Sequence, residues 1–118
     1  MNENEMKIRT KEFAKRIMRL CRRLPENREG RLLGNQIFRS GTSVAANYRA
    51  VCRARSKAEF VSRLAIVEEE ADETLFWLEL ISEMKIFEKN ALESLMKETD
   101  EIIAITVASI KTARARHD

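Results

Sequence analysis

The sequence predicts an all-α protein, an antiparallel up-down four-helix bundle, on three observations. One Pro, three Gly and few aromatic residues among 118 residues favour helix over sheet. Apolar residues recur at alternating steps of three and four, which is the period of one helix face. The segments between these patterns are short, and short loops make consecutive helices antiparallel neighbours. We expect a single domain, 1–118, with helices at about residues 7–24, 31–55, 57–87 and 91–113.

The first two predicted helices are separated by a clear break. The apolar stripe of the first consists of Phe13, Ile17, Leu20 and Leu24. Pro25 ends that helix, and Pro25–Gly30 forms the loop. The core positions of the second helix, at the same spacing, are Leu33, Ile37, Ser40, Val44, Asn47 and Val51.

Capping boxes predict where the third and fourth helices begin. Ser56 is the expected N-cap of the third helix, with Glu59 as its reciprocal partner. A heptad series predicts its core-facing seam: Phe60, Leu64, Val67, Ala71, Thr74, Leu78 and Ile81. Asn90 and Glu93 form a second expected box, which would open the fourth helix.

The second helix carries polar and small residues where a helix normally presents its core. Ser40 and Asn47 lie one heptad apart on its apolar stripe. Such residues either hydrogen-bond within their own bundle or specify a self-association surface, to which the adjacent Tyr48 would belong. Next to this stripe runs a second one, Gly34, Phe38, Gly41, Ala45, Tyr48 and Cys52. A mid-helix Gly costs about 1 kcal/mol relative to Ala, which indicates close packing by another backbone.

Apolar residues outside the predicted core favour self-association. Phe76 falls opposite the seam of the third helix, with Trp77 beside it, and the fourth helix is apolar nearly all round. Contiguous exposed apolar surface usually marks an interface, so we expect a homo-oligomer. Phe76 could instead stack on a nucleic-acid base, but the acidic residues around it would repel phosphate.

Charge is distributed unevenly along the chain. Residues 1–63 hold 16 Lys and Arg against 6 Asp and Glu, whereas residues 64–118 hold 6 against 13. The first part is therefore strongly basic and the second acidic, although the whole chain carries only +3. This asymmetry indicates either a basic face for an anionic partner or two halves that attract each other.

Cations of the first two helices are the candidates for nucleic-acid binding. Arg39, Arg49 and Arg53 are expected on the outward face of the second helix, followed by Arg55 and Lys57. The first helix adds Lys11, Lys15, Arg16, Arg19, Arg22 and Arg23. Cations spaced along rigid helices neutralise successive phosphates and give salt-sensitive binding of RNA or DNA without sequence preference. The alternative is a solvated face that pairs with the acidic residues 68–73 of a neighbouring subunit.

No residue pattern points to catalysis, a metal or a cofactor. The sole His, His117, lies in the tail, and no Glu-x-x-His pair of a di-metal bundle is present. No glycine-rich phosphate loop follows a strand. Cys21 and Cys52 have no metal-ligand spacing and are expected to be reduced thiols. Neither a signal-peptide core nor an apolar stretch of membrane-spanning length occurs, so we expect a cytoplasmic protein that is not an enzyme.

Two strings carry a resemblance to a known family. QIFRSGTSVAANY and ARSKAEFVSRLAIVEEEADETLFWLEL resemble the four-helix-bundle proteins encoded within intervening sequences of bacterial 23S rRNA genes. The resemblance covers roughly residues 13–108. Its most specific positions are Arg39, Ser40, Ser43, Asn47, Ser56, Glu59 and Phe60. It implies a non-enzymatic antiparallel bundle that assembles as a ring, commonly a homopentamer.

A second likeness bears on ligands. The accessory variability proteins of diversity-generating retroelements are similar in architecture and bind nucleic acid through basic surfaces, which by analogy points to Arg39, Arg49, Arg53 and Arg55. The resulting hypothesis is a homo-oligomer that binds RNA or DNA through a basic face. The alternative is a structural module, binding itself or another protein, whose charge asymmetry serves subunit assembly.

Overall fold

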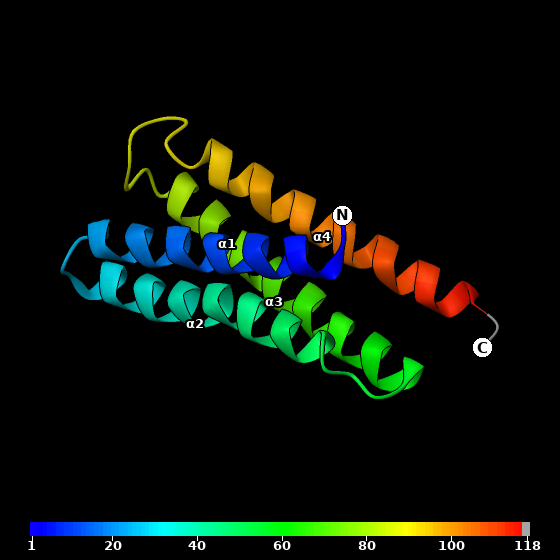
Figure 1. Cartoon of the computed structure of the whole chain (residues 1–118). Coiled ribbons are helices and arrows are strands. Elements are labelled where there is room, and N and C mark those ends of the chain that lie inside the picture. The colour runs from blue at the N-terminus through cyan, green and yellow to red at the C-terminus, as the bar shows by residue number, and fades with distance from the viewer. Residues whose placement is uncertain (117–118) are drawn as a thin grey trace.

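Four helices make up this computed structural model, which describes residues 1–116 of the chain. They are α1 (Glu3–Arg23), α2 (Arg28–Val51), α3 (Lys57–Glu83) and α4 (Glu93–Ala115). Figure 1 shows each helix running back alongside the one before it, in a bundle of 51 × 21 × 19 Å. The predicted all-α four-helix bundle is therefore confirmed. The tail residue His117 lies outside the described residues.

Side-chain caps decide where α1 and α2 begin. The Asn2 side chain accepts a hydrogen bond from the backbone N–H of Glu5, and the Glu5 carboxylate accepts one from the N–H of Asn2. This capping box starts α1 at Glu3, earlier than the apolar period alone predicted. Asn27 caps α2 with its side chain alone: its Oδ1 accepts a hydrogen bond from the backbone N–H of Gly30 at 2.8 Å.

The two caps predicted for α3 and α4 have different outcomes. Ser56 does cap α3, because its hydroxyl accepts from the N–H of Glu59. The Glu59 carboxylate reaches one residue further back than predicted, to the N–H of Arg55. The second box is wrong: Asn90 adopts a left-handed φ of 70°, and α4 begins without a side-chain cap at Leu92. An Asn tolerates the left-handed region, so here it turns the chain instead of capping it.

The core follows the predicted seams with one shift. Every seam residue of α3 is buried except Phe60, which is half-buried. In α2 the buried residue after Val44 is Tyr48, whereas Asn47 is only partly buried. Ser40, Val44 and Tyr48 are each four residues apart, so the buried face of α2 continues through Tyr48 and not through Asn47. At the centre, the hydroxyls of Ser40 and Thr74 lie 2.9 Å apart and satisfy each other inside the bundle.

Two glycines let α1 and α2 approach each other. A Cβ on Gly41 would lie 2.7 Å from both γ carbons of the buried Ile17, so a helix with a side chain there could not pack this closely. At the other end, a Cβ on Gly30 would fall 1.8 Å from the carbonyl oxygen of Pro25. The small residues of α2 therefore serve close packing within this chain.

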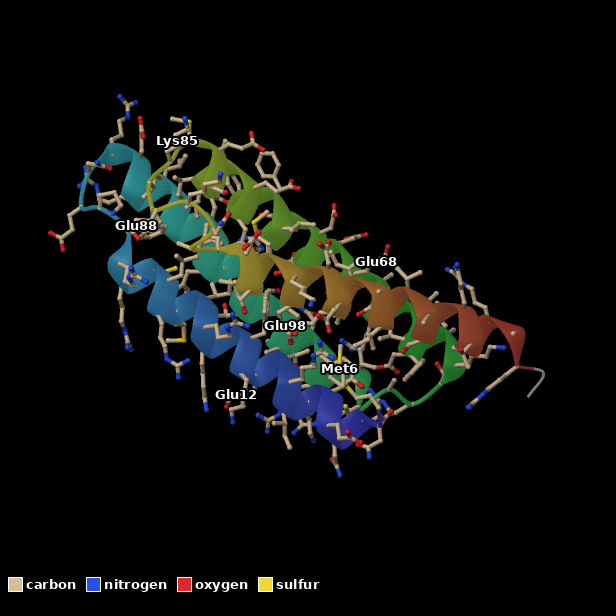
Figure 2. All side chains as sticks on the ribbon, turned by 90° about the horizontal axis from the view of Figure 1, so that it is seen from above. Met6, Glu12, Glu68, Lys85, Glu88 and Glu98 are labelled. Atoms are coloured by element: carbon tan, nitrogen blue, oxygen red, sulfur yellow. The ribbon has the colours of Figure 1, made fainter. Side chains whose placement is uncertain are left out.

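The first and last helices meet through polar contacts. Close backbone approaches occur mainly between consecutive helices and are rare between α1 and α4. Arg9 bridges that gap, with both ends of its guanidinium 2.7 Å from the carboxylate oxygens of Glu98 and a further bond to Glu101. Figure 2 shows Glu98 beside α1, and Lys85 and Glu88 in the loop at the far end from the C-terminus. No helix within residues 1–116 is both long and apolar enough to cross a bilayer.

Candidate nucleic-acid interface

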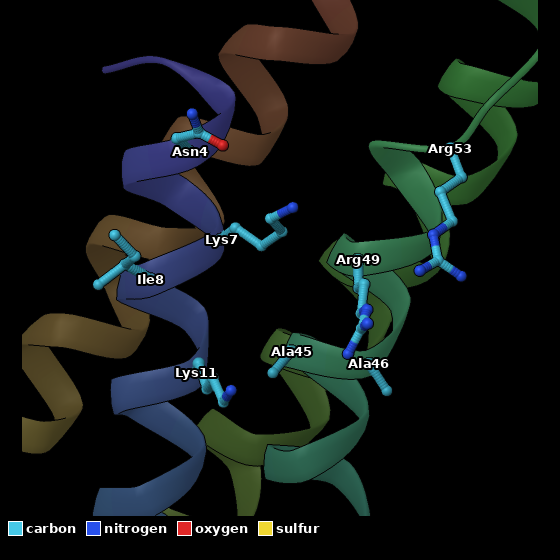
Figure 3. Close-up of a pocket in the computed structure, with 8 residues that line it drawn as sticks. All are labelled: Asn4, Lys7, Ile8, Lys11, Ala45, Ala46, Arg49 and Arg53. Carbon is cyan, nitrogen blue, oxygen red and sulfur yellow. The ribbon is translucent and has the colours of Figure 1, made fainter.

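A basic groove of about 650 Å³ runs between α1 and the C-terminal half of α2. Its lining comprises Asn4, Lys7, Ile8, Lys11, Ala45, Ala46, Arg49 and Arg53. Figure 3 shows Lys7 and Lys11 projecting from one wall and Arg49 and Arg53 from the other. All four cations are exposed, and the lining contains no acidic residue. The lining of the groove therefore carries four positive charges and no negative one.

Helix geometry places these four cations together. Lys7 and Lys11 are one turn apart on α1 and therefore share one face of that helix, whereas Arg49 lies in the last turn of α2 and Arg53 in the turn that directly follows α2. The helices run in opposite directions, which brings the start of α1 beside the end of α2 (Figure 1). Ala45 and Ala46 keep the space between the walls open because their side chains are a single methyl group.

A second, smaller hollow of about 280 Å³ lies on the other side of α2, towards α3. It is lined by Ala46, Arg49, Ala50, Arg53, Arg55, Glu59 and Arg63. Glu59 is its one acidic lining residue, and this carboxylate bonds to the side chain of Arg63 at 3.1 Å. Glu59 also accepts a hydrogen bond from the backbone N–H of Arg55. That bond, and to a smaller extent the one from the Arg63 side chain, holds the pKa of Glu59 below its ordinary value. The hollow thus keeps an excess of positive charge.

Arg39 is exposed, as expected for the outward face of α2, but it lines neither hollow of the basic surface. Arg39 points towards α3, where its guanidinium pairs with Glu70 at 3.0 Å and with Glu73. The pairing with acidic residues 68–73 that the sequence suggested for a neighbouring subunit therefore occurs within one chain.

The other predicted cations lie away from the groove between α1 and α2. Arg16 donates to the hydroxyl of Ser94 on α4 at 3.0 Å, and Arg23 lies 5.3 Å from the ring centre of Phe87. Arg19 is exposed on α1. Lys57, at the start of α3, donates to the backbone carbonyl of Arg116. The structure thus joins Arg49, Arg53 and Arg55 into one surface and leaves these residues outside it.

The candidates for a subunit interface separate into surface and core. Phe76 is 53% exposed and packs edge-on against Trp77, with ring centres 4.9 Å apart. Ser40 and Tyr48 are buried inside the bundle, so the prediction that they face a partner is wrong. Asn47 donates to the backbone carbonyl and hydroxyl of Ser43 on its own helix. Of the predicted set, Phe76 and Trp77 remain at the surface.

The Trp77 side chain is held by an acidic neighbour. Its indole N–H donates to the carboxylate of Glu73 at 3.1 Å, and Arg39 binds the same carboxylate from α2. The hydrogen bond from Trp77, and to a smaller extent that from Arg39, keeps the pKa of Glu73 below its ordinary value. The aromatic pair is therefore fixed to the junction of α2 and α3.

The two thiols and the phenol of the chain are partly or fully withdrawn from solvent. Burial raises the pKa of the thiols of Cys21 and Cys52, which keeps them protonated. Burial likewise raises the pKa of Tyr48 to about 12. Among residues 1–116, no cluster of three or more His, Cys, Asp or Glu side chains is placed to hold a metal ion.

Sequence reasoning did not identify Lys7 or Arg63 as part of the basic surface. Lys7 was the expected first residue of the first helix, and Arg63 lies on the third helix, whereas the candidate cations came from the first two helices and the start of the third. The spacing of Lys7 and Lys11 gave a usable signal, because residues one turn apart share a face. What the sequence lacked was the alignment of α1 against α2, which Gly41 and Ile17 set by packing.

The profile of the 23S rRNA-intervening sequence protein family matches residues 2–108 of the chain. A crystal structure of a protein with unknown function, from the S23 ribosomal protein family of Bacteroides thetaiotaomicron, is also similar. Its TM-score is 0.86 and its sequence identity 36%, over 94% of this chain and 99% of that one. Comparison with curated proteins gives no match.

Proposed function

The chain belongs to the 23S rRNA-intervening sequence protein family, and from this premise we propose that it is a non-enzymatic, homo-oligomeric bundle that binds nucleic acid. The observation that carries the proposal is the groove between α1 and α2, where four exposed cations from two helices meet without an acidic lining residue. Phosphate contacts from such cations supply most of the affinity of sequence-independent binding. The family's name refers to 23S rRNA, so RNA is the first ligand to test.

Salt dependence is the sharpest test of this proposal. Four phosphate contacts predict a slope of about −3.6 for log affinity against log salt, or roughly a 150-fold loss of affinity between 50 and 200 mM salt. Titration of a labelled structured RNA, followed by fluorescence anisotropy, measures both quantities. The double variant Arg49→Gln/Arg53→Gln should lower the magnitude of the slope by about 1.8.

The matched control removes the same charge elsewhere. Lys111 and Arg114 are exposed on α4 and line neither hollow of the basic surface. Lys111→Gln/Arg114→Gln should therefore leave the slope unchanged. Absence of binding at low salt, or equal losses in both double variants, would contradict a specific role for the groove.

A structural role in subunit assembly is the second candidate. It is favoured by the exposed Phe76 beside the half-buried Trp77, on a helix whose surface is largely acidic. An acidic, apolar surface of one subunit fits a basic surface of another, and a ring such as a homopentamer repeats that contact. In this case the assembled mass, and not nucleic-acid binding, would depend on salt.

A further inference from the structure

The two basic hollows have a common wall, the C-terminal half of α2. Ala46, Arg49 and Arg53 line both of them. Ala45 lines only the hollow towards α1, and Ala50 only the one towards α3. The surface of α2 between the two hollows is therefore a low ridge of three alanines, which we call the alanine ridge. Arg49 and Arg53 extend from this ridge and line the hollow on each side of it.

Each side of the ridge has cations of its own. Lys7 and Lys11 line the α1 side, and Arg55 and Arg63 line the α3 side. With the two shared arginines, six cations form two tracks that flank one helix. Glu59, bonded to Arg63 and to the backbone of Arg55, is the single acidic residue in either lining.

The chemistry of the lining bears on the form of the ligand. Proteins that bind single strands stack unpaired bases on aromatic side chains, and neither hollow has an aromatic residue in its lining. Alanine offers no hydrogen-bond donor or acceptor that could read a base edge. The surface is therefore suited to phosphates whose bases are already paired with one another.

We propose that the ligand is a nucleic-acid duplex that straddles the alanine ridge, with one phosphodiester backbone in each hollow. Lys7 and Lys11 contact one strand, Arg55 and Arg63 contact the other, and Arg49 and Arg53 lie between the two. A helix is about 10–12 Å across, which matches the roughly 12 Å width of the major groove of B-form DNA. We expect binding to be independent of sequence, because the three alanines carry no group that reads a base edge and the two arginines are assigned to phosphates. This inference rests on the proposed nucleic-acid binding.

The experiment compares duplexes with their separate strands. A 20-base-pair RNA duplex, the DNA duplex of the same sequence, one duplex of scrambled sequence and each single strand are titrated by fluorescence anisotropy at several salt concentrations. We expect the duplexes to bind at least tenfold more tightly than the single strands, and the scrambled duplex to bind equally well. We expect the DNA duplex to bind more tightly than the RNA duplex, because the major groove of B-form DNA is wide enough for a helix and that of A-form RNA is narrow.

Two double variants test whether both hollows are used. Lys7→Gln/Lys11→Gln removes the cations of the α1 side, and Arg55→Gln/Arg63→Gln those of the α3 side. Each should reduce the magnitude of the salt slope for duplex by about 1.8, and the combined variant by about twice that amount. Lys111→Gln/Arg114→Gln is the control, and circular dichroism checks that every variant remains helical.

The outcomes separate this inference from the proposed function. Equal or tighter binding of single strands would overturn the duplex proposal while leaving nucleic-acid binding intact. An effect of the α1-side variant alone would also overturn it, because a single strand in one groove would then suffice. Failure of all these nucleic acids to bind at low salt would instead refute the proposed function.

Discussion

Gly41 determines how closely α1 and α2 approach. A methyl group there would lie 2.7 Å from two carbons of Ile17, which is fully buried and, being β-branched, is stiff at χ1. We predict that Gly41→Ala destabilises the fold by about 1–3 kcal/mol, although Ala favours helix over Gly. Chemical denaturation measures the difference.

Gly34, on the same helix, is the matched control for that substitution. Its Cβ would meet only Leu24 Cδ1 at 3.5 Å, an ordinary contact. Gly34→Ala should therefore stabilise the protein by about 0.5–1 kcal/mol, the usual gain in a helix interior. Equal effects of the two substitutions would show that close packing at Gly41 is not the constraint.

Tyr48 provides a pH test of the core. Its buried phenol has a pKa raised from 10.0 to about 12, because desolvation disfavours tyrosinate. The folded state therefore favours the neutral phenol, and this contribution is complete below pH 10 and is lost as the pH rises through about 12. Tyr48 is the only Tyr, so tyrosinate absorbance follows it alone. The native midpoint should lie above that of urea-unfolded protein, and coincident midpoints would place the phenol in water.

At the scale of the element, the end of α3 contains one energetically unfavourable backbone conformation. Lys85 follows the last turn with a left-handed φ of 57°, a conformation that favours Gly at this position. We predict that Lys85→Gly raises the free energy of unfolding by about 0.5–1 kcal/mol in a thermal or urea titration. Lys89 is also exposed but has an ordinary φ, so Lys89→Gly should be neutral or destabilising. A stabilisation of similar size at both positions would contradict a local effect at Lys85.

Elements could be predicted from the sequence where a local rule acts alone. The heptad of α3 and the cap at Ser56 depend only on spacing and a nearby hydroxyl, and both are confirmed. Asn2 and Asn90 each precede a Glu by three residues, yet only Asn2 caps a helix. After Asn90, whose φ is left-handed, the buried Leu92 takes the N-cap position of α4. Tertiary packing thus overrides the local signal.

At the scale of the whole molecule, charge could be predicted from the sequence, but the site could not. The excess of cations in residues 1–63 is visible in the composition. Which of them meet depends on the alignment of α1 against α2, and packing at Gly41 sets it. Arg39 and Arg49 look equivalent in sequence, yet Arg39 is paired with carboxylates of α3 while Arg49 lines the open groove.

We predict that copies of this chain assemble through the aromatic pair Phe76 and Trp77. Phe76 is 53% exposed beside Trp77, and burying the exposed half of such a side chain is worth about 1 kcal/mol. We expect light scattering at micromolar concentrations to give several times the 13.7 kDa of one chain. Phe76→Ser should weaken each subunit contact by roughly fivefold. Leu32→Ser removes a similarly exposed apolar residue from α2 that lines neither basic hollow, and it should leave the mass unchanged. A wild-type protein that stays at 13.7 kDa would show that the aromatic pair does not hold copies of this chain together.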